Sequence, residues 1–102
     1  MPTVEEALIY LGIDYTDDVV TANVTRALAS AVSLVHGSVG EDVEEYLPSD
    51  PRVRELVLLY TDDLYTNRGL SYKQIGSQRR LIADMEWQLR LELRQLKEAA
   101  RA

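Results

Sequence analysis

"DPRVRELVLLYTDDLYTNRG", residues 50–69, carries the clearest helix signals in the chain. Asp50 before Pro51 is a typical helix start, because an aspartate N-cap accepts from free amides and proline suits the first helical position. Apolar residues then recur three or four positions apart, as one buried helix face requires. They are Val53, Leu56, Val57, Tyr60 and Leu64. The segment predicts a helix that begins at Pro51 and ends at Gly69, which can take a positive φ at C′.

The end of this helix combines Tyr65, Asn67, Arg68 and Gly69. Arg68 suits the negative end of the helix dipole, and Asn67 can satisfy a loose backbone group. The simplest role for these residues is a structural helix end, with direct partner binding as the alternative.

Asp62 and Asp63 are the first candidates for chemistry in this segment. Consecutive helical residues point about 100° apart, so this pair is poorly placed to chelate one ion or to act as a catalytic pair. His36 is the only histidine, and no cysteine is present. No phosphate loop, nucleophile elbow or HExxH motif occurs. We therefore expect no enzyme activity, no catalytic or metal-binding residues, and no cofactor.

Toward the N-terminus the sequence predicts two more helices. Thr3 and Glu6 form a capping box for the first, and Gly12 is its natural stop. Thr16 is a plausible N-cap for the second, which we expect to end at Gly37. The apolar stripe of this second helix is Val20, Val24, Ala27, Leu28, Ala31, Leu34 and Val35. Residues 37–50 are predicted to be a loop with one helical turn at 41–46.

Toward the C-terminus, residues 70–77 are predicted to be a second loop, followed by a long helix from about Gln78 to about Ala99. No segment alternates with the period of a strand. The chain of 102 residues, without an interdomain linker, predicts one domain over 1–102. The expected fold is all-α: about four helices in a small bundle with a long C-terminal helix.

The last helix has two apolar faces when projected at about 100° per residue. The wider face is the expected core stripe: Leu81, Ile82, Met85, Leu89, Leu93 and Leu96. Trp87 and Leu91 fall on the far side. Between the two faces lies a basic ribbon of Arg79, Arg90, Arg94, Lys97 and Arg101. Interfaces favour tryptophan and arginine together. We therefore expect Trp87, Arg90, Leu91 and Arg94 to bind another subunit or a partner protein.

Charge is divided unevenly along the chain, whose net charge is −6. The first 50 residues contain ten acidic residues and one basic residue, whereas the last 52 contain ten basic and seven acidic residues. This balance argues against nucleic-acid binding by the whole domain. It suits copies of one chain that meet front to back. No apolar run approaches the roughly 20 residues of a membrane span, so no membrane partner is expected.

Three segments, in this order, resemble the small head–tail connector (adaptor, or head-completion) proteins of long-tailed bacteriophages, a family also labelled "possible DNA packaging". "VEEALIYLGID" at 4–14 resembles their start. Residues 50–69 resemble their central helix, with Tyr65, Asn67 and Arg68 matching its end. "MEWQLRLELR" at 85–94 resembles their C-terminal Gln-Leu-Arg segment, with Gln88, Leu89 and Arg90 matching. The segment 70–79 departs from the pattern, because it lacks a proline before the last helix.

This resemblance implies an oligomeric virion protein of the head–tail junction, assembled in the host cytoplasm. It implies a homo-oligomeric ring that matches the symmetry of the portal protein and binds it after DNA packaging. Its further partners would be stopper or tail-completion proteins, with DNA passing through the lumen without sequence-specific binding. A ring needs a front-to-back interface, and an acidic first half against a basic last helix would supply complementary charge.

Two other functions remain open from the sequence. The chain could be a DNA-packaging accessory that binds nucleic acid through the arginine-rich face of its last helix. It could also be a small helical regulator of a host protein. Ring formation separates the connector from the regulator, and salt-dependent DNA binding identifies the packaging accessory.

Overall fold

The computed structural model describes residues 1–66 and 76–101, with the backbone alone for 76–79. These residues form five helices: α1 (Val4–Tyr10), α2 (Asp18–Ser38), α3 (Val43–Tyr46), α4 (Pro51–Thr66) and α5 (Gly76–Arg101). The described residues contain no strand. The predicted all-α fold with a long C-terminal helix is confirmed. The fifth helix is α3, the single turn that the sequence predicts within 41–46.

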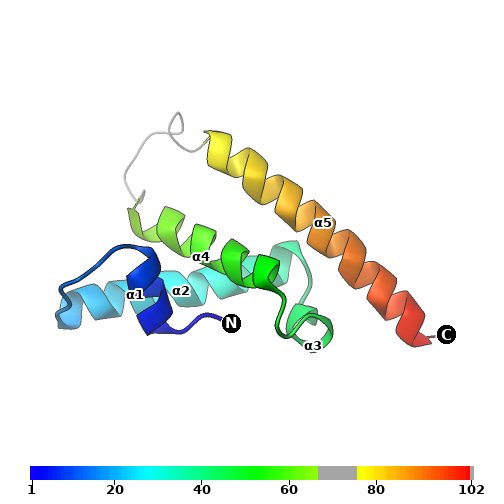
Figure 1. Ribbon diagram of the computed structural model, residues 1–102, viewed down its shortest axis with the longest axis horizontal. Helices are drawn as coiled ribbons and strands as arrows, with labels where there is room; N and C mark the ends of the chain where they lie inside the picture. The colour runs from blue at the N-terminus through cyan, green and yellow to red at the C-terminus, as the bar shows by residue number, and fades with distance from the viewer. Residues whose placement is uncertain (67–75, 102) are drawn as a thin grey trace.

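The helices form a flat, elongated molecule measuring 50 × 29 × 17 Å. Figure 1 shows α2 and α4 side by side and antiparallel, with α1 crossing them near one end. Helix α5 lies along α4 and contacts α3 and α2, and its C-terminal part projects past α3 (Figure 1). The α1–α2 connection and the C-terminal end of α5 therefore lie at opposite ends of the molecule.

The helix starts largely follow the capping signals. The Thr3 hydroxyl accepts from the Glu6 amide at 3.2 Å, and the Asp50 carboxylate accepts from the Arg52 amide at 2.8 Å. The predicted N-cap of α2 is wrong by one residue. The cap is Asp17, whose carboxylate accepts from the amide of Val20 at 2.8 Å. An aspartate there also places its charge at the positive end of the dipole.

The helix ends are predicted less well. Gly12 stops α1 as expected, with a φ of 73°. The expected stop at Gly37 is wrong, because α2 continues to Ser38 and the positive φ, 154°, falls at Gly40. A Cβ on Gly40 would lie 2.6 Å from a methyl carbon of Leu93, so a glycine there lets α5 approach closely. The predicted helix end at Asn67, Arg68 and Gly69 lies outside the described residues, as does 70–75 of the predicted loop. Its last two residues, 76 and 77, belong to α5.

The main core lies between α2, α4 and α5. Its fully buried members include Val35, Leu56 and Leu89, one from each helix. Three predicted core positions are wrong: Leu34, Leu81 and Leu96 are 44%, 51% and 37% exposed. A helical projection gives the direction of a side chain, but not how far the neighbouring helices reach along the axis.

Leu58 and Thr61 are buried, although neither belongs to the predicted stripe of α4. The reason for Leu58 is α1, which covers a second side of α4. Leu58 packs there with Ala7 of α1 and Val24 of α2 in a small separate cluster. The Thr61 hydroxyl donates to the Val57 carbonyl at 2.7 Å, which satisfies it inside the core.

Helix α2 has the length and composition of a helix that could cross a membrane. The expectation that no segment could span a membrane rested on uninterrupted apolar runs and did not detect this property of α2. Within the fold, however, α2 is the central helix, and Val24, Ala31 and Val35 are fully buried against its neighbours. A core helix passes the same test of length and composition. The absence of a membrane partner therefore stays a prediction.

Candidate partner-binding edge of the last helix

The strongest candidate site is the outer edge of α5, defined by Trp87, Arg90, Leu91 and Arg94. Trp87 is 60% exposed and Leu91 is 42% exposed, although residues on the opposite side of the same helix, Leu89 and Leu93, are buried. Both arginines are exposed as well. The predicted exposure of this second face is confirmed, whereas its binding of a partner stays a prediction. An exposed tryptophan and leucine flanked by two arginines have the composition of an interface centre.

The basic ribbon borders a surface hollow beside the turn between α2 and α3. Arg90, Arg94, Lys97 and Arg101 line this hollow together with Gly40. Two of these cations form ion pairs with acidic side chains of the same chain. Lys97 forms an ion pair with Asp42 at 2.7 Å, and Arg94 lies 3.4 Å from Glu98 one turn along α5. The ribbon is therefore partly neutralised, which the sequence did not indicate.

Helix α5 is fixed to the start of α4 by Arg52. Its guanidinium donates to Asp50 at 2.6 Å and to Glu92 of α5 at 2.7 Å. These bonds hold the pKa of Asp50 and of Glu92 below their usual range. Likewise, the hydrogen bond from Lys97 lowers the pKa of Asp42. These charge pairs join α5 to the start of α4 and to the start of α3, beside the buried contacts of Leu89 and Leu93.

A shallow groove runs between α2, α4 and α5. Its lining includes the small residues Ser30, Ser33 and Gly37 of α2, and Glu86 of α5. Burial raises the pKa of Glu86, while Arg90 and Ser38 act in the opposite direction. The raised pKa has a structural cause, since α5 places this carboxyl against α2.

The carboxylates of Asp62 and Asp63 do not form a metal site with their described neighbours. Asp62 accepts a hydrogen bond from the Thr66 hydroxyl at 2.7 Å. Residues 1–66 and 76–101 contain no group of three acidic or histidine side chains that could hold a metal ion. His36 lies in the last turn of α2, as expected, and its Nε2 is 2.6 Å from Glu44. That histidine joins α2 to α3.

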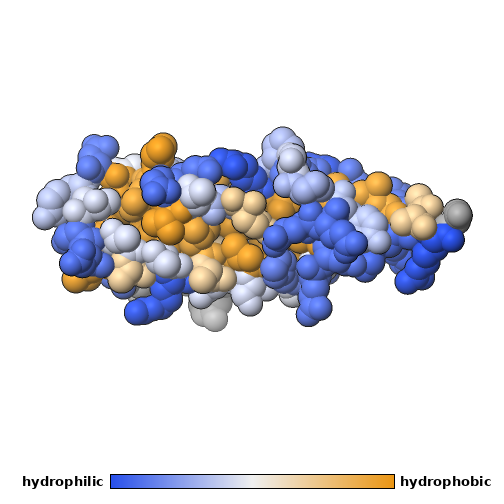
Figure 2. Space-filling model, turned by 90° about the horizontal axis from the view of Figure 1, so that it is seen from below, coloured by the Kyte–Doolittle hydropathy of each residue, from blue (hydrophilic) through white to orange (hydrophobic). Residues whose placement is uncertain are grey.

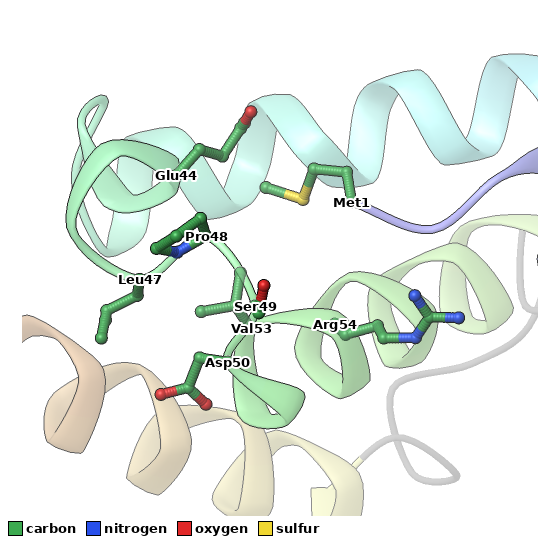
Figure 3. A pocket seen from close by; sticks show the side chains of 8 residues that line it. All are labelled: Met1, Glu44, Leu47, Pro48, Ser49, Asp50, Val53 and Arg54. Carbon is green, nitrogen blue, oxygen red and sulfur yellow. The ribbon is translucent and has the colours of Figure 1, made fainter.

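Figure 3 shows a pocket where the N-terminal segment meets the α3–α4 connection, with Met1 at its rim. Its volume of about 190 Å³ is below the several hundred Å³ of a typical small-molecule site. Two of the charged residues that line it have partners: Asp50 pairs with Arg52, and Arg54 pairs with Glu6 of α1. The pocket therefore offers no free charge from those two residues for binding a polar ligand.

The predicted helix end is described only in part. Tyr65 lies in the last turn of α4 and packs against the small cluster of Ala7, Val24 and Leu58. Asn67, Arg68 and Gly69 lie outside the described residues, so their structural role stays a prediction. The contact of Tyr65 with this small cluster favours a packing role for that tyrosine.

Comparison with protein-family models, curated proteins and solved structures finds no match to this chain. The described residues form a small helical protein in which α5 is buried on one side and exposed on its outer side.

Proposed function

We propose that this chain is a structural connector that assembles into a ring at the head–tail junction of a long-tailed bacteriophage. In this proposal it binds the portal protein after DNA packaging and joins the capsid to stopper or tail proteins. The observation that carries the proposal is the exposed Trp87–Leu91 pair on α5, flanked by Arg90 and Arg94. The sequence resemblance described above supplies the class of assembly.

The shape and charge of the molecule support self-assembly in particular. A ring requires two different surfaces on each subunit, because its contacts are head to tail. The chain is elongated, and its acidic residues are concentrated in the first half and its basic residues in the second. Two unlike surfaces on one chain can then meet repeatedly without self-repulsion.

Substitutions on the outer edge test this proposal. Trp87→Ala is expected to weaken assembly by about 2 kcal/mol or more, as for a residue at an interface centre. That corresponds to roughly a 30-fold loss of affinity. Replacing Arg90 and Arg94 together by glutamate is expected to slow assembly most at low salt, where repulsion is least screened. Neither change should unfold the monomer, since all three side chains are exposed.

The measurement combines circular dichroism with native mass spectrometry and electron microscopy of the protein, alone and with its portal. Arg26→Glu is the control, because Arg26 is also exposed but belongs to α2 and not to the outer edge. Variants of the outer edge that assemble like the parent would refute the assignment of this edge. Variants that fail to fold would show that Trp87 belongs to the core.

A second function, nucleic-acid binding, is favoured by one observation: four basic side chains line the same hollow on α5. Phosphate contacts from such a cluster would make DNA affinity fall steeply with salt. Fluorescence anisotropy with duplex DNA at several salt concentrations tests this directly. Salt-dependent binding that is lost in the Arg90→Glu, Arg94→Glu variant, while rings still form, would favour the packaging accessory over the connector.

A further inference from the structure

The three most exposed large apolar side chains of the described residues lie within one short segment, residues 9–19. They are Ile9 at the end of α1, Tyr15 in the connection and Val19 in the first turn of α2, and their exposed fractions are 78%, 74% and 68%. Figure 1 shows this connection at the end of the molecule opposite the C-terminus. With Asp14 and Asp18, these residues define the acidic corner.

The acids of this corner are available, in contrast to several others in the first half. Glu6, Asp42 and Asp50 pair with basic side chains of the same chain. Within the described part of the chain, Asp14 and Asp18 are exposed and form no ion pair. A surface that combines unpaired charges with exposed apolar side chains can form both ion pairs and apolar contacts with one partner.

The acidic corner and the outer edge of α5 are complementary. One combines exposed apolar side chains with aspartates, and the other combines Trp87 and Leu91 with two arginines. In Figure 1 the corner lies at the start of α2, whereas residues 87–94, drawn in orange, lie in the half of the molecule that contains the C-terminus. The two surfaces of one chain therefore cannot meet, but those of two copies can.

We propose that the outer edge of α5 in one copy docks on the acidic corner of the next copy. This inference rests on the proposed self-assembly and adds the surface that receives α5. The contact places Trp87 and Leu91 against Ile9, Tyr15 and Val19. It places Arg90 and Arg94 near the aspartates of the corner, so that opposite charges surround an apolar centre.

The other acidic region of the first half fits this role less well. Glu41 and Glu45 beside α3 are exposed, but Val43 between them is buried and Tyr46 is half-buried. Figure 2 shows that the surface over α3 is a strongly hydrophilic block, whereas hydrophobic and hydrophilic side chains lie next to each other toward the α1–α2 end. A tryptophan would therefore find less exposed apolar surface there than at residues 9–19.

Exchange of the charges tests the pairing. The corner variant carries Asp14→Lys and Asp18→Lys, and the edge variant carries Arg90→Glu and Arg94→Glu. Each is expected to associate with itself about tenfold more weakly than the parent or worse, because like charges then face each other. Mixing the two variants should restore association, since each then offers the other an opposite charge. One chain with all four substitutions should also regain it.

The matched control is Glu41→Lys with Glu45→Lys, an equal charge change in the same acidic half. Sedimentation velocity and native mass spectrometry measure association, and circular dichroism verifies folding. We expect the control to associate like the parent. If the control loses association as the corner variant does, or if the mixture and the four-substitution chain stay dissociated, the corner is not the partner of α5.

The parent protein separates failure of this pairing from failure of the proposed function. A parent that stays monomeric up to about 1 mM, where a contact of roughly 4 kcal/mol is half occupied, overturns both the self-assembly and this pairing. A parent that forms rings, with a corner variant that forms them equally well, overturns only the pairing.

Discussion

Helices α4 and α5 are both amphipathic, but they have very different surroundings. Helix α4 has neighbours on several sides, and it buries Val53, Leu56, Val57, Leu58 and Thr61 within 16 residues. Among its described side chains α5 buries Ile82, Leu89 and Leu93, although the helix has 26 residues. The difference shows that amphipathic pattern alone does not set burial. The number of neighbouring helices does, and α5 packs on one side only.

This contrast assigns different tasks to the two helices. Substitutions inside the α2–α4 pair should act on the stability of the monomer, whereas those on the far side of α5 should act on association. A third set of residues joins α5 to the other helices, and substitutions there should have intermediate effects on stability. These residues are Leu89, Leu93 and the charge pairs of Arg52 and Lys97.

The largest effect is expected for Leu56→Asp in α4. Leu56 is fully buried, so the substitution buries an unpaired charge in the core and should unfold the protein. Leu28→Asp in α2 should do the same. The control is Leu81→Asp in α5, where the leucine is 51% exposed and the fold should persist. Far-ultraviolet circular dichroism and thermal melting distinguish these outcomes, and normal melting of both core variants would remove this core assignment.

The next effect compares two leucines of α5 that are two residues apart. Leu89 is fully buried and Leu91 is 42% exposed. Leu89→Ala should lower the free energy of unfolding by about 2–5 kcal/mol, because it removes buried surface and leaves a cavity. Leu91→Ala should cost about 0.5 kcal/mol or less in the monomer but should weaken association. Urea denaturation measures the first quantity. Equal destabilisation by both changes would contradict the one-sided packing of α5.

The same contrast explains which features were predictable from the sequence. Most local signals were reliable: Asp50 and Pro51 start α4, Thr3 and Glu6 cap α1, and Gly12 ends it. The exceptions are the bounds of α2, which is capped by Asp17 instead of Thr16 and continues past Gly37. These signals depend on residues only a few positions apart. Leu81 and Leu96 were misassigned to the core because their burial depends on how far α2 and α4 extend beside α5. Residues close to them in the sequence do not determine that distance.

The long-range charge pairs also could not be predicted from the sequence. Arg52 and Glu92 are 40 positions apart, and Lys97 and Asp42 are 55 positions apart. Both pairs form because α5 lies along the start of α4 and beside α3. The outer edge was predictable because Trp87, Arg90, Leu91 and Arg94 share one helix. The acidic corner was not predicted, since the exposure of Ile9, Tyr15 and Val19 depends on how α1 crosses α2.

A smaller effect is expected at the junction between α4 and α5. The hydrogen bonds from Arg52 hold the pKa of the Asp50 carboxyl below its usual range. A lowered pKa stabilises the fold above the pKa of the unfolded chain, and this contribution is lost as the pH falls through the folded-state value. Asp50→Asn keeps a residue that can cap α4 but removes the charge. It should lower stability by about 1 kcal/mol at neutral pH.

The pH dependence separates charge from capping. The parent should begin to lose its advantage over Asp50→Asn as the pH falls below about 4, where Asp50 of the unfolded chain becomes protonated. It should lose that advantage completely only below the lowered pKa of the folded carboxyl. Asp17→Asn is the matched control, because Asp17 caps α2 and forms no ion pair with the described basic groups. Urea titrations at several pH values measure the difference. A constant gap between parent and Asp50→Asn from neutral to acidic pH would exclude the ion pair as its source.

The smallest effect is expected where the sequence first suggested chemistry, at Asp62 and Asp63. Replacing both by alanine should change the free energy of unfolding by no more than about 0.5 kcal/mol and leave assembly unaltered, because both positions lie on a partly exposed side of α4.

Asp62 nevertheless has one measurable influence, which is on the pKa of Tyr10. Burial raises the pKa of Tyr10, with Glu55 and Asp62 adding to the shift. Asp62→Ala should therefore lower the Tyr10 pKa modestly, whereas Asp63→Ala should not. Carbon-13 NMR titration of the tyrosine rings measures this change. A nuclease activity that disappears in the double variant, with the fold intact, would instead show that the pair performs chemistry.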